Sequence, residues 1–244
     1  MDFTAWEPRY RAILEEFHFS PEAERASRDW LVRALGPGGG YAGLQAGEGD
    51  LSRILRGAQV LIVGRGAGSL PLPLFAHPTL TGPWVTIACD GATSACLARG
   101  SVPDLIVSDL DGYLPDEIEA NRRGSLLLVH AHGDNLELLQ DWLPLFPGPV
   151  LGSCSDAPLP PLLNVGGFAD GDRALHLAEA YGARRALLAG FRERPGRSGE
   201  GAQGDLRRRK LLRSQALLRE LQARGRLSVE FLDGAVRQET PVYQ

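Results

Sequence analysis

The sequence contains little cysteine and no long apolar run. The three cysteines, Cys89, Cys96 and Cys154, are widely spaced and form no CxxC pair, so the pattern indicates neither a disulfide framework nor a zinc site. No stretch approaches the roughly 20 apolar residues that cross a bilayer. The first residues include acids and a proline, where a signal peptide needs a basic and then an apolar run. We therefore expect a cytoplasmic protein with no place in a membrane.

Excess charge of one sign is also missing. The formal net charge is −4, with 23% charged and 43% hydrophobic residues, which is typical of a globular protein and not of a disordered chain. A basic run at residues 207–210 lies among leucines at helical spacing, so a solvated helix face explains it more simply than nucleic-acid binding. We expect small-molecule partners and no nucleic acid, and a homo-oligomer is compatible with this composition.

Strands and helices alternate along the chain. Short apolar runs, typical of parallel strands with both faces buried, occur at residues 60–63, 84–88, 105–107, 126–129 and 186–189. Helix-like stretches separate them at residues 92–99, 135–143 and 171–181. This alternation predicts an α/β fold with a doubly wound, mostly parallel, Rossmann-like sheet. In such sheets, ligands bind beyond the carboxyl ends of the strands.

The N-terminal flank of this sheet is predicted to be helical. Aromatic and apolar residues recur about once per helical turn over residues 6–17. Ser20 followed by a proline predicts the start of a second helix, which ends at the glycine-rich run from Gly36. We therefore expect an N-terminal helical extension at residues 1–57 and an α/β domain at residues 58–244.

The C-terminal flank divides into three parts. Residues 192–204 are rich in glycine and charge without periodicity, which predicts a mobile loop. Residues 206–221 are good helix formers, and residues 227–232 form a last apolar segment that predicts an edge strand before a polar tail.

Acidic side chains follow two successive predicted strands. Asp109 and Asp111 come directly after one strand, and an extended backbone points side chains two residues apart in the same direction. Like charges so close repel each other unless a cation lies between them. Oxygen ligands favour Mg²⁺, which joins carboxylates to substrate phosphates. Asp90, with Gly91 and Thr93 after it, ends the preceding strand, where capping of the next helix is the alternative role.

Two histidines, a carboxylate and an amide follow the next strand, as His130, His132, Asp134 and Asn135. A His-x-His pair alone suggests a transition-metal site, but a third ligand of that type is missing nearby. We therefore interpret Asp134 as a further carboxylate of the Mg²⁺ or polyphosphate site. The histidines are interpreted as hydrogen-bonding or charge-stabilising groups, with a purely structural role as the alternative.

Two glycine-containing segments lie where phosphate could dock. Residues 64–69 (GRGAGS) follow the first strand, so their backbone N–H groups could cradle a phosphate. The segment completes neither a dinucleotide fingerprint nor a P-loop, and a simple tight turn is the alternative. Residues 164–173 (NVGGFADGDR) lead into a helix start, where a phosphate or a ring edge could bind and where Asp170 could equally be a cap.

Polar turns on successive strands suit phosphoryl transfer, in which positioning and charge neutralisation supply most of the catalysis. Acyl transfer is disfavoured because the sequence has no Gly-x-Ser-x-Gly nucleophile elbow.

Four segments match the motifs of one known family. They are DGATS at residues 90–94, PDLIVSDLDG at 103–112, HAHGDN at 130–135 and NVGGFADGDR at 164–173. In this order and spacing they resemble the archaeal 6-hydroxymethyl-7,8-dihydropterin pyrophosphokinase family, which is itself similar to thiamin pyrophosphokinases. The resemblance covers roughly residues 58–191. It implies ATP as diphosphate donor, AMP as co-product, Mg²⁺ as cofactor and a place in archaeal pterin cofactor biosynthesis.

The resemblance and the residue chemistry together assign the expected site residues. The metal ligands are Asp109, Asp111, Asp134 and Asp90. The catalytic residues are Asp109, Asp111, Asp134 and His132. The ATP-binding residues are Gly64, Gly66, Ser69, Asp90, Gly91, Thr93 and Arg173. A pterin edge needs matching polar groups, for which the candidates are Asn135, Asn164, Asp172 and His130.

Other functions remain open at this stage. Thiamin or another primary alcohol could be the acceptor, and a nucleotide-binding regulator could use the same fold without turnover. A nicotinamide oxidoreductase is weakened by the incomplete glycine fingerprint. We also hypothesise that residues 192–204 close over the bound polyphosphate, with Arg197 as the contacting residue.

Overall fold

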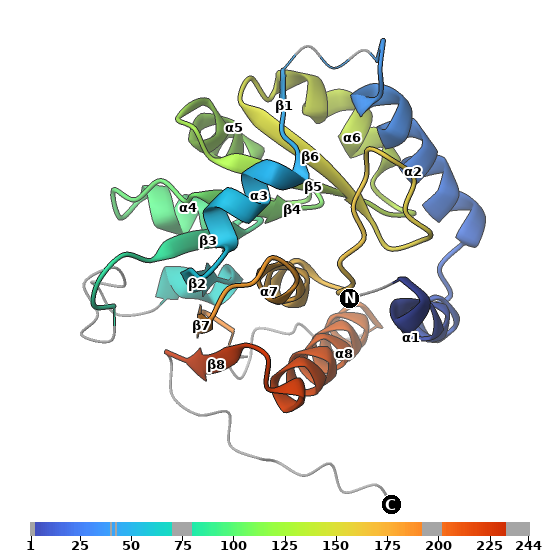
Figure 1. Cartoon of the computed structure of the whole chain (residues 1–244). Helices are drawn as coiled ribbons and strands as arrows, with labels where there is room; N and C mark the ends of the chain where they lie inside the picture. The colour runs from blue at the N-terminus through green and yellow to red at the C-terminus, as the bar shows by residue number, and fades with distance from the viewer. Residues whose placement is uncertain (1–2, 40, 42, 70–79, 192–201, 233–244) are drawn as a thin grey trace, which may run out of the picture.

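The computed structural model describes residues 3–39, 41, 43–69, 80–191 and 202–232 (Figure 1). Within these residues, eight strands form one sheet in the order β1-β6-β5-β4-β3-β2-β7-β8. Every neighbouring pair in the sheet is parallel. The predicted doubly wound α/β sheet is therefore confirmed.

The strands are β1 (Leu44–Gln45), β2 (Gln59–Val63), β3 (Val85–Cys89), β4 (Leu105–Ser108), β5 (Leu126–Ala131), β6 (Pro149–Cys154), β7 (Arg185–Ala189) and β8 (Ser228–Phe231). The helices are α1 (Phe3–Phe17), α2 (Pro21–Leu35), α3 (Glu48–Leu55), α4 (Ala92–Leu97), α5 (Leu114–Arg122), α6 (Leu136–Trp142), α7 (Asp170–Ala180) and α8 (Ala202–Arg224). Two 3₁₀ turns are η1 (Arg65–Ser69) and η3 (Leu143–Leu145).

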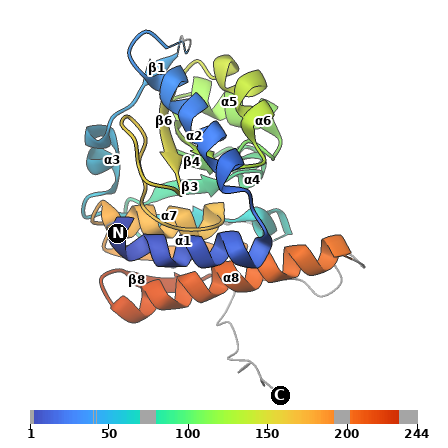
Figure 2. The same cartoon turned by 90° about the vertical axis from the view of Figure 1, so that its right-hand side faces the viewer.

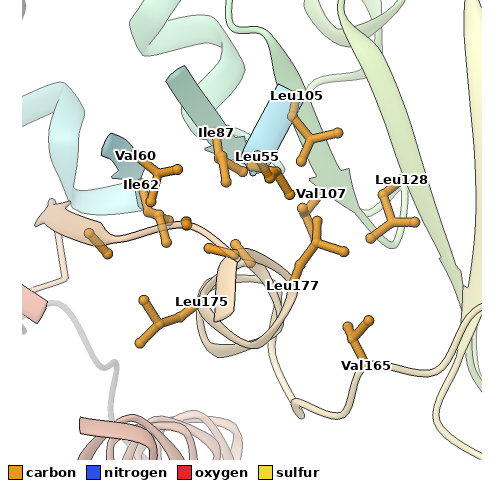
Figure 3. Close-up of a cluster of buried hydrophobic side chains, with 14 of the residues drawn as sticks. Leu55, Val60, Ile62, Ile87, Leu105, Val107, Leu128, Val165, Leu175 and Leu177 are labelled. Carbon is orange, nitrogen blue, oxygen red and sulfur yellow. The ribbon is translucent and has the colours of Figure 1, made fainter. Parts of the chain in front are cut away.

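Helices cover both faces of the sheet because its strands are apolar on both sides. In β2, Val60 and Ile62 join a core cluster with α3, α7 and α8, whereas Leu61 and Val63 join a cluster with α4 on the opposite face. Side chains alternate between faces along a strand, so a continuous apolar run serves both layers. Figure 3 shows the first cluster, with Leu175 of α7 close to the strand residues.

The two predicted N-terminal helices are confirmed. Trp6, Tyr10 and Phe17 are buried along α1. The Ser20 hydroxyl accepts a hydrogen bond from Ala23 N at 3.2 Å, so Ser20 caps α2 as expected. Helix α1 lies alongside α8 (Figure 2) and shares an apolar cluster with its Leu217. Helix α2 covers the sheet face that α5 and α6 also cover.

Three elements differ from the sequence-based expectation. Strand β6 was not predicted, because Gly152 and Ser153 interrupt its apolar run. Strand β1 lies inside the N-terminal segment and pairs with β6, so the sheet begins earlier than residue 58. Helix α5 was not predicted; it is short and has a proline in its first turn.

The C-terminal part contains a helix and an edge strand, as predicted. Strand β8 is the edge strand next to β7. Helix α8 begins at Ala202, so the last residues of the predicted loop are helical. Residues 192–201, including Arg197, lie outside the described residues. In the described part of the chain, no helix has both the length and the apolar character to cross a membrane.

Strand order brings the polar turns together. Strands β2, β3, β4 and β5 are consecutive neighbours. Because they are parallel, the turns that follow them lie along one edge of the sheet. The motifs found in the sequence therefore meet at this edge.

Candidate active site

Three carboxylates converge at the carboxyl ends of β3 and β4. Asp90 follows β3, and Asp109 and Asp111 follow β4. One oxygen of each lies within 4.8 Å of one oxygen of the other two. Leu110, between the two later aspartates, has a φ of 68° and is buried, so it anchors the turn while its neighbours face the site. The expected convergence of these three acids is thus present.

The turn after β4 approaches the Asp90 carboxylate so closely that only glycine fits. A Cβ on Gly112 would lie 2.2 Å from Asp90 Oδ1. The Asp90 side chain is buried, and its own φ of 47° is unusual for a residue other than glycine. The backbone of Asp90 itself and the backbone at Gly112 therefore together fix the position of this carboxylate.

Among the described residues, Arg65 is one of two cationic side chains that contact this carboxylate group. Its Nη2 lies 2.9 Å from Asp90 Oδ2 and 3.2 Å from Asp111 Oδ1. Nevertheless, burial and the negative charges of Asp109 and Asp90 raise the pKa of Asp111 to about 6. The pKa of Asp111 thus stays raised beside this exposed guanidinium, so the carboxylate group favours a further cation.

His132 connects the carboxylates to Asp134. Its Nε2 lies 3.0 Å from Asp109 Oδ2, and its Nδ1 pairs with Asp134 Oδ1. Burial lowers the pKa of His132, but the two carboxylates outweigh it and raise the value to about 10. The hydrogen bond from His132 lowers the pKa of Asp134 to about 2. His132 is therefore an imidazolium at neutral pH.

Asn135 fixes the turn that carries His132. Its Nδ2 donates to Asp109 O at 2.8 Å and to His130 O at 2.7 Å, and its Oδ1 accepts from His132 N at 3.0 Å. The side-chain amide thus joins the turns after β4 and β5. A direct contact between Asn135 and a substrate remains a prediction.

His130 is buried at the end of β5. Its Nδ1 lies 3.0 Å from Ser153 Oγ, and its Nε2 lies 3.2 Å from Ser155 Oγ. Burial, together with the positive charge of Arg173, lowers the pKa of His130 well below its usual value. A neutral imidazole with both nitrogens hydrogen-bonded fits the structural alternative. Its predicted substrate contact is not tested by this arrangement.

The segment before α7 is held by its own polar side chains. Asp172 accepts hydrogen bonds from Phe168 N at 2.5 Å, Ala169 N at 3.0 Å and Ser214 Oγ at 2.5 Å. Asn164 Nδ2 donates to two backbone carbonyls, one of them Ser155 O at 2.9 Å. These two predicted substrate-binding residues therefore shape the loop around the site.

Arg173 is a buried guanidinium with weak partners. It is 1% exposed, and its contacts to Gly166 O, Ser155 Oγ and Phe168 O measure 3.4–3.5 Å. Its Nε has no hydrogen-bond partner among the described residues. Burial lowers the pKa of Arg173. A guanidinium held so loosely has capacity left for an anionic ligand.

Sequence reasoning missed two residues of this site. Capping of α7 was the alternative role given for Asp170, but burial and the charges of Asp109 and Asp90 raise its pKa well above the usual value, so its charge interacts with those of the carboxylate group. Arg65 lies in the glycine turn at residues 64–69, but the sequence predicted no function for its side chain. The sequence feature that could have identified both residues is their position inside motifs that lie beyond strand ends.

The glycine turn packs against β7. Gly64 N donates to Ala189 O at 2.8 Å, and Gly66 N donates to Gly190 O at 3.0 Å. A Cβ on Gly66 would lie 2.6 Å from Gly190 O. These contacts support the tight-turn alternative for both glycines. ATP binding by Gly64, Gly66 and Ser69 stays a prediction.

Gly91 and Thr93 lie at the start of α4. Gly91 is the N-cap residue of this helix, and Thr93 N donates to Asp90 O at 2.9 Å. The Thr93 side chain is fully buried, and its hydroxyl has no hydrogen-bond partner among the described residues. Their contact with a nucleotide is likewise untested.

The part of the chain that carries these motifs is similar to proteins of one known family. Residues 50–191 match the family model described as 6-hydroxymethylpterin diphosphokinase MptE-like. A protein of Methanothermobacter thermautotrophicus named 6-hydroxymethyl-7,8-dihydropterin pyrophosphokinase is 39% identical over 191 residues, which cover 78% of each chain. Proteins with the same name from Pyrococcus furiosus (39% identity, 78% of each chain) and Methanocaldococcus jannaschii (34%, 78% of this chain and 80% of the other) are also similar. The chain therefore belongs to the MptE-like 6-hydroxymethylpterin diphosphokinase family.

Proposed function

We propose that this chain transfers diphosphate from ATP to 6-hydroxymethyl-7,8-dihydropterin in pterin cofactor biosynthesis, with AMP as the co-product. The family and the names of three relatives support the acceptor and the reaction. The observation that carries the proposal is the convergence of Asp90, Asp109 and Asp111 at one edge of the sheet. No observation favours thiamin over the pterin as acceptor.

The donor set fits Mg²⁺. All three groups offer carboxylate oxygens, which Mg²⁺ prefers, and the raised pKa of Asp111 marks uncompensated negative charge. We propose that Asp90, Asp109 and Asp111 hold the ion, which when bound neutralises and aligns the polyphosphate. Asp134 is proposed as a further carboxylate of the same site, through the oxygen that does not pair with His132.

The transfer is a substitution at the β-phosphorus of ATP. The hydroxymethyl oxygen forms the new bond to this phosphorus and gives up its proton to solvent water. The bond from the phosphorus to the oxygen bridging it to the α-phosphorus breaks, so AMP leaves. Most of the catalysis then comes from alignment and charge stabilisation. The three carboxylates and the fixed turns of this edge supply that alignment.

Cationic side chains surround the proposed path of the diphosphate. His132 is protonated at neutral pH, so it stabilises negative charge and does not act as the base. Arg65 and the buried Arg173 supply two further positive charges. Preorganised charges of this kind lower the barrier without rearrangement during the reaction.

The acceptor side is proposed to be formed by Asn135, Asn164, Asp172 and His130. Their side chains are hydrogen-bonded within the protein. Their proposed contribution is therefore to fix the loops that present polar groups to the pterin edge. Unpaired polar groups against such an edge would cost about 1–3 kcal/mol each.

The test is incubation with ATP, Mg²⁺ and either hydroxymethyl-dihydropterin or thiamin. AMP released in step with pterin diphosphate supports the proposal. Release of ADP, or AMP with thiamin only, contradicts the stated reaction or acceptor. ATP binding without AMP would identify a nucleotide-binding regulator instead.

A further inference from the structure

A buried acid of the N-terminal helices contacts the active-site turn. Glu24 lies in α2 and is 6% exposed. Its Oε1 accepts a hydrogen bond from Gly133 N at 2.8 Å, and its Oε2 accepts one from the Tyr10 hydroxyl at 3.2 Å. One carboxylate therefore joins α1, α2 and the turn after β5.

A buried carboxylate at this place needs an explanation. Taking an acid out of water is unfavourable, and burial raises the pKa of Glu24 despite its hydrogen bond from Gly133. An apolar side chain of similar length would pack between the helices without that cost. Among the described residues, the groups that favour the carboxylate are the hydrogen bonds from Gly133 N and the Tyr10 hydroxyl and the positive charge of His132. Two of these three lie in the turn after β5.

Gly133 is the contact closest to the reaction site. It lies between His132 and Asp134, which form the ion pair of the site. The turn is held from inside by Asn135, which accepts from His132 N at 3.0 Å. It is held from outside by Glu24. A Cβ on Gly133 would lie 3.1 Å from Glu24 Oε1, so the helix packs directly on the turn.

The same helices contact a second loop of the site. The Trp6 indole N–H donates to Ser155 O at 3.0 Å, and Ser155 Oγ contacts His130 Nε2. Arg28 Nη1 pairs with Asp156 Oδ2 at 2.7 Å. Helices α1 and α2 therefore touch the turns after both β5 and β6, and Glu24 is the contact that reaches the catalytic turn.

We propose that Glu24 is a positioning residue for the transfer reaction. By accepting from Gly133 N, it fixes the backbone between His132 and Asp134, so that His132 Nε2 stays 3.0 Å from Asp109 Oδ2. Tyr10 orients the Glu24 carboxylate through its hydroxyl. The N-terminal helices are thus part of the active-site framework. The expected effect of Glu24 on turnover rests on the proposed function, whereas its effect on the Gly133 backbone does not.

The experiment compares Glu24→Met with Glu24→Gln in the full-length chain. Methionine keeps the length of the side chain and removes both acceptor oxygens, whereas the glutamine oxygen still accepts from Gly133 N. Glu22→Met is the matched control, because Glu22 lies in the same helix but is exposed. Three quantities are measured: the hydrogen-exchange rate of the Gly133 amide by NMR, kcat and KM for ATP, and the melting temperature.

We expect Gly133 exchange to be at least about tenfold faster in Glu24→Met. Its kcat should fall by about tenfold or more through loss of alignment, with a smaller change in KM and no loss in melting temperature. Glu24→Gln should stay within about threefold of wild type in kcat, because a neutral acceptor keeps about half the strength of the bond. Glu22→Met should match wild type.

Unchanged kcat and unchanged Gly133 exchange in a folded Glu24→Met protein would overturn the inference. Equal impairment of the Gln and Met variants would also overturn it, because charge and not hydrogen bonding would then matter. If Glu24→Met does not fold, Tyr10→Phe decides the matter, since it removes only the hydroxyl that orients Glu24. Gly133 exchange equal to wild type in that variant contradicts the inference. The exchange rate needs no substrate, so it distinguishes this failure from failure of the proposed function.

Discussion

Arg65 and Asp90 form an ion pair at the centre of the carboxylate group, with 2.9 Å between Nη2 and Oδ2. The same nitrogen lies 3.2 Å from Asp111, so the guanidinium stands where a metal ion would neutralise the same two acids. Arg65 is largely exposed, which leaves it free to turn toward a phosphate when a metal takes its place. We therefore expect this pair to link metal binding to polyphosphate binding.

The first prediction concerns this link. Arg65→Ala should bind Mg²⁺ alone about two- to fivefold more tightly, because a competing exposed ion pair worth up to about 1 kcal/mol is gone. Its kcat/KM for ATP should instead fall by about 10- to 100-fold, the effect of losing a charged hydrogen bond. Calorimetric titration with Mg²⁺ and steady-state kinetics measure the two changes. Parallel weakening of both would show that Arg65 is not a competitor for the metal position.

The second prediction concerns the close approach of Gly112 to Asp90. Gly112→Ala places a Cβ 2.2 Å from Asp90 Oδ1, so the carboxylate must move. A displacement on this scale should reduce turnover by about 10²-fold and weaken Mg²⁺ binding. Gly49→Ala is the control, because a Cβ there meets no atom within 4 Å. Wild-type Mg²⁺ affinity in Gly112→Ala would show that the position of Asp90 does not matter.

The third prediction concerns the charge of His132. Its pKa is raised to about 10 by Asp109 and Asp134, above the unfolded value of about 6.5. The stabilisation from its protonated form is therefore complete below about pH 6.5 and is lost as the pH rises toward 10. His132→Gln should lower the melting temperature most near pH 6 and progressively less up to pH 10. A pH-independent difference between the two proteins would contradict the ionic pairing.

Much of the fold and the centre of the site could be predicted from the sequence. Continuous apolar runs revealed β2 to β5, and the acids directly after β3 and β4 were expected at one edge. Strand β6 escaped prediction because Gly152 and Ser153 break its apolar run, although parallel neighbours bury it. Chain order gave no sign that α2 packs on the turn after β5, so Glu24 could not be found without the structure.

Asp170 and Arg65 show a second limit. Both lie within the quoted motifs, but Asp170 also satisfies the rule for a helix cap, and Arg65 also suits an exposed turn. Only the three-dimensional structure separates these roles, through the ion pair of Arg65 and the charge environment of Asp170. Motif residues that also fit a helix cap or an exposed turn are therefore harder to assign from sequence than the acids that a strand end delivers in pairs.

We propose that Asp109 and Asp111 act together as metal ligands. Asp109→Asn and Asp111→Asn nearly keep the side-chain shape and remove one charge each. Fewer anionic ligands leave the polyphosphate unneutralised, so we expect turnover to fall by at least about 10²-fold. Folding should be intact or improved, because burial and like charges raise the pKa of Asp111 and removing a charge relieves that repulsion.

The most direct measurement is turnover against Mg²⁺ concentration for wild type and both Asn variants, with the melting temperature of each protein. We expect a loss of at least about 10²-fold that high Mg²⁺ only partly restores, at an unchanged or higher melting temperature without metal. Full activity at ordinary Mg²⁺, or a collapse in melting temperature that explains the lost activity, would show that these aspartates are structural.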